Sequence, residues 1–201
     1  MDQYFTIEKS SQAEFKDRGS RFIAYAFPVS DTIAFKNKLQ EIKKEHGKAT
    51  HHCFAYRIGV TGDTFRVSDD GEPAGTAGKP ILGQIDSRAL VNTAVVVVRY
   101  FGGTLLGVPG LINAYKTVSA YSLQLTPVVR KQIEVIHTVE FNYTQMNEVM
   151  AIIKKFNCSV LQKDMELFCK FKIGIPRISL TETLHDFNEI AGIEISTVKN
   201  I

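Results

Sequence analysis

The hydrophobic pattern of the chain is strongest at residues 95–98, where four consecutive valines precede Arg99. This run is short, apolar and β-branched, which favours a strand buried on both faces over a helix. Helical spacing of apolar residues begins at Leu111, after Pro109, and proline is well tolerated in the first turn of a helix. Glycines occupy positions 102, 103, 107 and 110 between these elements. Free amides and the positive end of a helix would meet above this loop, so we expect it to bind an anion, with phosphate as the first candidate.

Upstream of the valine run, alternating and helical patterns predict an α/β domain. We expect strands over 5–7, 21–27, 53–60 and 64–68, and helices over 31–47, 81–90 and from Pro109 to near Pro127. Residues 8–17 are polar, and residues 69–80 contain three glycines and two prolines, which is typical of a loop.

After a basic joint at Arg130 and Lys131 the pattern changes. It predicts strands over 134–141, 158–162, 166–173 and 193–198, with helices over 144–156 and 178–190. The order βαββαβ is that of a ferredoxin-like domain. We therefore expect an α+β chain with two domains, residues 1–131 and residues 132–201.

Composition and charge narrow the class of protein. No apolar run approaches the roughly 20 residues that cross a bilayer, and the first residues lack the order of a signal peptide. The three cysteines are far apart, which argues against a disulfide framework or a structural zinc site, so we expect a cytoplasmic protein. Residues 1–133 carry 17 Lys and Arg against 12 Asp and Glu, and residues 134–201 carry 7 against 9. This asymmetry favours an anion site in the first domain.

The candidate binding residues are cations and glycines of the first domain. The cations that would contact phosphate are Arg57, Arg66, Lys79, Arg99 and Lys116, and the glycines that would let a ligand approach are Gly102, Gly103 and Gly107. If the arginines share one face of the sheet they form a basic groove, and if they alternate they are ordinary edge residues. The glycine-rich loop is equally consistent with a tight turn alone.

A second set of residues would support the site. The carboxylates Asp69, Asp70 and Glu72 would shape a loop or orient the cations, His52 could bind phosphate or ribose, and Tyr100 could stack on a base. Cys53 follows two histidines, but no third soft ligand is near, so we expect no metal and an inert thiol. We expect no cofactor and no catalytic residue.

Four strings carry a resemblance to a known family: RFIAYAFPV (21–29), ATHHCFAYRIG (49–59), SDDGEPAGTAGKPIL (68–82) and VVVVRYFGGTLLGVPGLINAYK (95–116). They resemble the YigZ/IMPACT family. The resemblance implies a ribosomal protein S5 domain 2-like α/β sandwich, followed by a ferredoxin-like domain similar to a carboxy-terminal domain of elongation factor G. Eukaryotic relatives regulate translation initiation and carry an amino-terminal RWD domain instead, so the resemblance implies the bacterial two-domain architecture.

Three hypotheses for the function follow. The leading one is a non-catalytic regulator of translation that binds RNA, the ribosome or a ribosome-associated protein through a basic, glycine-lined groove of the first domain. The second is an enzyme acting on a nucleotide or another phosphorylated small molecule, with Asp69, His52 and Lys79 as acid, base and cation. The third is protein recognition through the ferredoxin-like domain, with the glycine loop purely structural. The oligomeric state does not follow from the sequence.

Overall fold

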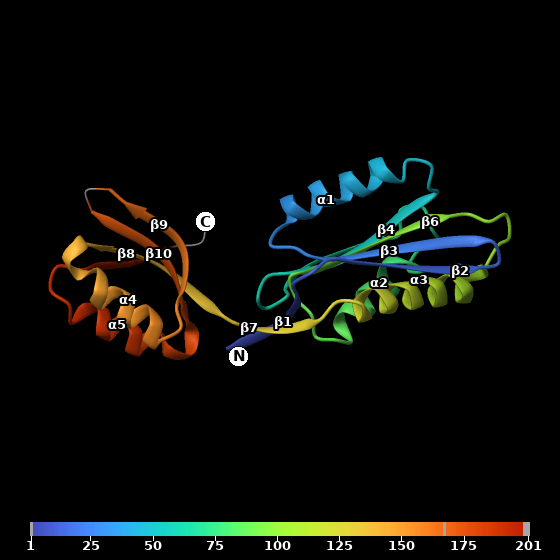
Figure 1. Cartoon of the computed structure of the whole chain (residues 1–201). Helices are drawn as coiled ribbons and strands as arrows, with labels where there is room; N and C mark the ends of the chain where they lie inside the picture. The colour runs from blue at the N-terminus through green and yellow to red at the C-terminus, as the bar shows by residue number, and fades with distance from the viewer. Residues whose placement is uncertain (1, 167, 199–201) are drawn as a thin grey trace. The chain divides into compact units, whose positions relative to one another are not determined.

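The computed structural model describes residues 2–166 and 168–198, and these fall into two compact units (Figure 1). The N-terminal unit spans Tyr4–Lys131, and the C-terminal unit comprises residues 2–3, 132–166 and 168–198. Among the described residues, no helix combines the length and the apolar character that crossing a bilayer requires.

A five-stranded sheet forms the centre of the N-terminal unit, and every strand is antiparallel to its neighbours. In spatial order its strands are β2 (Ser11–Asp17), β3 (Ser20–Pro28), β6 (Thr93–Tyr100), β4 (His51–Ile58) and β5 (Thr64–Ser68). The valine run lies in β6, the middle strand, and residues 94–98 have no exposed surface. The prediction of a strand buried on both faces is confirmed.

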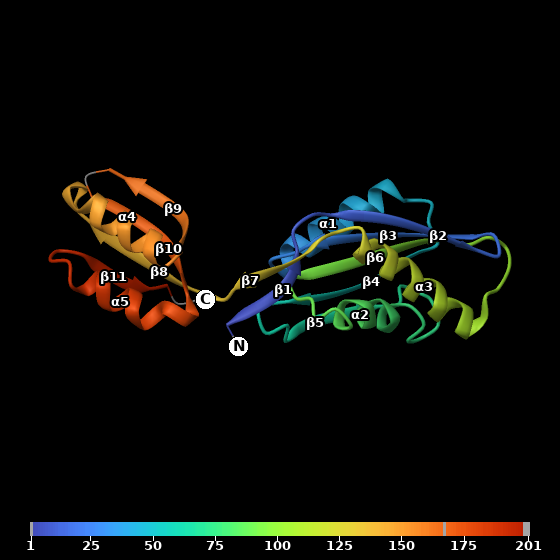
Figure 2. The same cartoon turned by 60° about the horizontal axis from the view of Figure 1, so that its bottom comes forward.

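Helices cover both faces of this sheet (Figures 1 and 2). Helix α1 (Thr32–Glu45) packs on one face through Phe35 and Ile42. Helices α2 (Gly78–Asp86) and α3 (Gly107–Gln124) cover the other face, where Tyr115 and Phe22 are in the core. Because strand side chains alternate, even-numbered residues of β6 face α1 and odd-numbered residues face α2 and α3.

Two strands of the N-terminal unit lie where the sequence pattern predicts none. Strand β2 occupies the polar stretch 8–17, and β7 (Val128–Gln132) occupies the expected basic joint and pairs with β1 (Gln3–Ile7). In β2, half-buried and exposed positions alternate, but Phe15 is the only large apolar residue on the half-buried side. The burial of β2 comes from α3, so a local pattern could not reveal it.

The C-terminal unit has the predicted βαββαβ order, with α4 and α5 packed on one face of a four-stranded antiparallel sheet. The sheet order is β11-β8-β10-β9. The elements are β8 (Glu134–Phe141), the 3-10 turn Tyr143–Gln145, α4 (Met146–Lys155), β9 (Ser159–Met165), β10 (Cys169–Pro176), the 3-10 turn Arg177–Ser179, α5 (Leu180–Asn188) and β11 (Glu194–Thr197). The expected strand 166–173 is shifted to Cys169–Pro176, because the exposed edge strand β9 continues through polar residues to Met165.

Candidate functional site

One end of the five-stranded sheet gathers most of the candidate residues. Strands β3 and β4 begin there, and β6 ends there, because Arg21 pairs with Tyr100 and His51 pairs with Arg99. Helices α2 and α3 both start at this end. They follow the acidic loop (residues 69–77) and the glycine loop (residues 101–106). We call this region the glycine-loop end. It brings two helix N-termini to the same edge of the molecule.

Asp69 organises the acidic loop. Its Oδ2 accepts a hydrogen bond from the Gly75 amide at 2.9 Å, and its Oδ1 accepts from the amides of Ala77 and Gly78 at 3.0 and 2.9 Å. Burial raises the pKa of this carboxyl group, but the three amide donors and the positive field of Lys79 outweigh that effect, so the pKa lies below its usual value. The amides at the start of α2 are therefore used within the protein.

We predict a pH-dependent contribution of Asp69 to stability. Replacing Asp69 with asparagine should lower the free energy of unfolding at pH 7 by about 1–3 kcal/mol, because asparagine offers one acceptor oxygen in place of two and leaves an amide donor unpaired. Because the folded pKa is depressed, the contribution is present above the unfolded value of about 3.9 and is lost as pH falls through the folded pKa. Urea unfolding of both proteins between pH 7 and pH 3 should show the difference narrowing in acid. A difference that widens on acidification would contradict this role.

A buried polar network connects the acidic loop to β6 and α3. Arg99 donates from Nη1 to Glu72 Oε1 at 2.7 Å and from Nη2 to Ser20 Oγ at 3.3 Å. The Tyr115 hydroxyl donates to the same Glu72 oxygen at 2.7 Å. The Arg99 and Glu72 side chains are 6% and 3% exposed, so this ion pair is shielded from solvent. Arg99 is thus committed to holding the acidic loop, not free to meet a phosphate.

Cys53 belongs to the same network. Its thiol donates to the Asp69 carbonyl oxygen at 2.9 Å and lies 3.3 Å from the Tyr115 hydroxyl. Burial raises the pKa of the thiol far above its usual value, which disfavours the thiolate that nucleophilic chemistry requires. Among the described residues, no three His, Cys, Asp or Glu side chains are grouped so that they could hold a metal ion.

The glycines of the glycine-loop end have different roles. A Cβ on Gly102 would lie 1.9 Å from the carbonyl carbon of Gly19 in the β2–β3 turn, so Gly102 is required for close backbone packing. Gly103 and Gly107 have positive φ, and a Cβ on Gly103 would meet open space. Within the described chain, the amides of residues 103–106 donate to no protein group. Residues 103–105 are also exposed, whereas Leu106 is buried.

The structure does not bring all five candidate cations together. Arg57 faces the same side of the sheet as Arg99. It lies six residues along β4 from His51, the residue that pairs with Arg99, which is a distance of about 20 Å. Its guanidinium pairs with Asp86 at 2.7 Å. Arg66 lies on the opposite face, over the Phe54 ring. Lys116 is on α3, nine residues after its start, about 14 Å along the helix axis. Only Lys79 is exposed at the glycine-loop end itself.

The supporting residues His52, Asp70 and Tyr100 lie on the α1 side of the same end. The His52 amide donates to Asp70 Oδ2 at 2.7 Å, and burial lowers the pKa of the His52 imidazole. The Tyr100 hydroxyl bonds to His46 Nδ1 at 2.8 Å. His52 and Asp69 thus face opposite sides of the sheet. The arrangement of acid, base and cation that the enzyme hypothesis needs does not form around them.

Two cations at this end were not among the sequence candidates. Arg18 occupies the β2–β3 turn, with φ of 44°, beside Gly19, which packs on Gly102. Lys48 lies in the connection from α1 to β4. Both side chains are exposed, and neither has an ion pair within the described residues. The dipeptide Arg18–Gly19 was a usable turn signal, because positive φ favours glycine.

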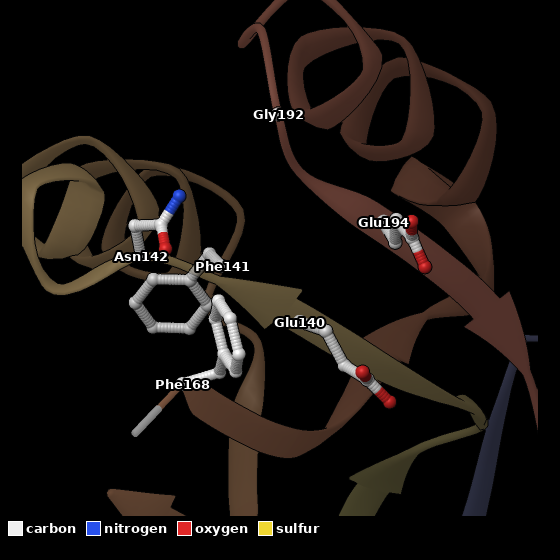
Figure 3. A pocket seen from close by; sticks show the side chains of 6 residues that line it. All are labelled: Glu140, Phe141, Asn142, Phe168, Gly192 and Glu194. Carbon is white, nitrogen blue, oxygen red and sulfur yellow. The ribbon is translucent and has the colours of Figure 1, made fainter. Parts of the chain in front are cut away.

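The C-terminal unit has a pocket of about 250 Å³ at the end of β8 (Figure 3). Its walls include the rings of Phe141 and Phe168, and Glu140 and Glu194 lie directly opposite each other on β8 and β11. Lys170 neutralises Glu140 at 2.6 Å. The open sheet face of this unit carries no exposed aromatic platform among its described strand residues, so base stacking is not favoured there.

Comparisons with known proteins place these features in a family context. Residues 18–123 match the family described as the Impact N-terminal domain. The chain is 41% identical over 150 residues to "IMPACT family member YvyE" of Bacillus subtilis, covering 74% of this chain and 69% of that protein. It is 33% identical over 165 residues to "IMPACT family member YigZ" of Escherichia coli, covering 81% of each. A crystal structure described as that of a hypothetical protein superposes with a TM-score of 0.75 and 28% identity, covering 100% of both chains.

Proposed function

Because the chain belongs to the IMPACT family, we propose that it is a translation-associated regulatory protein of the cytoplasm whose glycine-loop end binds a negatively charged component of the ribosome. The regulatory role follows from the resemblance to eukaryotic members that control translation initiation. We also propose the finer fold assignments: an S5 domain 2-like N-terminal unit and a ferredoxin-like C-terminal unit. The strand order β11-β8-β10-β9 supports the second assignment.

One observation carries the proposal: the three acids of the acidic loop make contacts within the protein, whereas three exposed cations and the amides of residues 103–106 have no partner among the described residues. Asp69 accepts three amides, Glu72 pairs with Arg99, and Asp70 accepts the His52 amide. The exposed cations at this end that have no ion pair among the described residues include Arg18 in the β2–β3 turn, Lys48 in the α1–β4 connection and Lys79 in the first turn of α2. Together with the helix N-termini and the amides of residues 103–106, they create a positive field.

This arrangement revises the candidate set from the sequence. Lys79, Gly103 and Gly107 keep the contact roles expected for them, and Arg18 and Lys48 join them. Arg99 and Gly102 instead maintain the shape of the end, through Glu72 and Gly19. Arg57 and Arg66 have no part in the proposed surface.

The test is co-sedimentation of the full chain with purified bacterial ribosomes over a series of salt concentrations. The variant Lys48→Ala/Lys79→Ala should bind more weakly, and, where both lysines contact phosphates, the slope of log affinity against log salt should fall by about 2, one for each lost contact. The matched control is Lys9→Ala/Lys36→Ala, two exposed lysines from the opposite end of the sheet, which should leave binding unchanged. Equal weakening by both variants, or no binding by the wild-type protein, would reject the proposal.

A further inference from the structure

Four exposed large apolar side chains lie on the glycine loop and the first turns of α3. Phe101, Leu105, Val108 and Ile112 are 46%, 81%, 52% and 38% exposed. We call these four residues the apolar ridge. Val108 and Ile112 are four residues apart and therefore lie on one face of α3. Large apolar side chains that gather on a surface mark interaction sites more often than single exposed ones do.

Lys116 and Arg18 are the cations at the two ends of the apolar ridge, and Asp17, at the end of β2, precedes Arg18. Lys116 continues the helical face of Val108 and Ile112, and the turn that carries Arg18 packs against the glycine loop at Gly102. The sequence from residue 87 to residue 133, which contains the whole ridge, has no Asp or Glu. A partner that covers the ridge would therefore meet cations at its rim and apolar groups at its centre.

The free amides of residues 103–106 add a second requirement. They lie within the ridge, between Phe101 and Val108, and covering them with an apolar surface alone would leave buried donors unpaired. Carboxylates satisfy such donors at a helix N-terminus. Nucleic acid would satisfy the amides through its phosphates, but it would leave the aliphatic side chains of Leu105 and Val108 without an apolar partner.

We infer that the apolar ridge binds an acidic, amphipathic protein segment, which places leucine- or phenylalanine-type side chains on the ridge and carboxylates on the amides and rim cations. This inference rests on the proposed function, and it states which kind of ribosome-associated component reaches the glycine-loop end. Contacts with the apolar ridge supply most of the binding free energy, and the cations Arg18 and Lys116 at its rim raise the association rate.

The probe is a synthetic 18-residue peptide with Leu and Phe on one helical face and Glu on the other, added to the isotope-labelled full chain. NMR shifts should concentrate on residues 101–112 and Lys116, and a scrambled peptide of equal composition should cause none of them. The variant Leu105→Asp/Val108→Asp should lower the affinity at least about tenfold, as expected for a lost central contact. The control Ile33→Asp changes an equally exposed apolar residue on α1 and should leave the affinity unchanged.

Ribosome sedimentation separates the two proposals. Loss of ribosome binding by Leu105→Ser/Val108→Ser, which adds no negative charge that would also repel RNA, supports the inference. If this variant binds ribosomes and the peptide as the wild type does, while Lys48→Ala/Lys79→Ala fails to bind ribosomes, the inference is overturned in favour of RNA and the proposed function stands. A wild-type dimer that the ridge variant dissociates would overturn it in favour of a second copy of the chain. Failure of the wild-type protein to bind ribosomes rejects the proposed function itself.

Discussion

Replacing Arg99 with alanine is expected to lower the free energy of unfolding by about 3–5 kcal/mol, the usual cost of removing one partner from a buried ion pair. The substitution leaves the Glu72 carboxylate 3% exposed, with the Tyr115 hydroxyl as its remaining close donor. It also removes the guanidinium that packs over the rings of Phe22 and Phe101. Urea unfolding of the full chain, followed by the signal of the N-terminal unit, measures the change.

Two further variants show whether burial of the ion pair causes the large loss of stability expected for Arg99→Ala. Arg57→Ala removes a pair of similar length with Asp86, but its side chains are 26% and 40% exposed, so the loss should be about 1 kcal/mol or less. Replacing Arg99 and Glu72 together with methionine should recover much of the stability lost in Arg99→Ala, because no unpaired charge remains buried. If Arg99→Ala costs no more than Arg57→Ala, the network does not hold the acidic loop.

The second large effect is expected at Gly102. A methyl group there would overlap the backbone of Gly19 and Ser20, with the nearest atoms at 1.9 and 2.3 Å. Main-chain atoms on both sides must move to make room, so Gly102→Ala should cost about 3 kcal/mol, the upper part of the range for overpacking. It should also shift the amide resonances of the β2–β3 turn, which an amide NMR spectrum records directly.

Gly103→Ala is the matched change in the same loop. Gly103 has φ of 86°, but its Cβ would meet open space, so the expected cost is the backbone penalty of about 1 kcal/mol. Resonances of the β2–β3 turn should stay in place. Equal destabilisation by the two substitutions would show that conformation, not contact with Gly19, makes glycine necessary at position 102.

Strand β6 and helix α3 could be predicted because their signals are local. The valines of β6 define a buried strand by themselves, and Pro109 with the apolar spacing after it defines the helix. The βαββαβ order of the C-terminal unit could also be predicted, since each of its elements has its own hydrophobic periodicity. Strand β2 lacks such a signal, because Phe15 alone marks its half-buried side and the helix that covers it follows much later in the chain.

The arrangement of the cations could not be predicted, because it depends on pairing between distant strands. Alternation within each strand leaves open whether Arg57 and Arg99 share a face, and the structure places both on the α2 and α3 side of the sheet. Only the antiparallel register of β4 with β6 shows that they lie at opposite ends. The partners that neutralise them, Asp86 and Glu72, come from later and earlier segments with no local signal. The glycine loop could therefore be located from the sequence more reliably than the charges around it.

The pairing of β1 with β7 has a consequence for how the chain can be divided. It brings the first and the last strand of the N-terminal unit side by side, so that the two ends of this unit are adjacent. Domains with adjacent ends tolerate insertion, exchange and circular permutation. The match to the family covers residues 18–123 and stops short of both strands. A fragment limited to residues 18–123 would lack the β1–β7 strand pair, whereas a fragment spanning residues 2–132 would retain it.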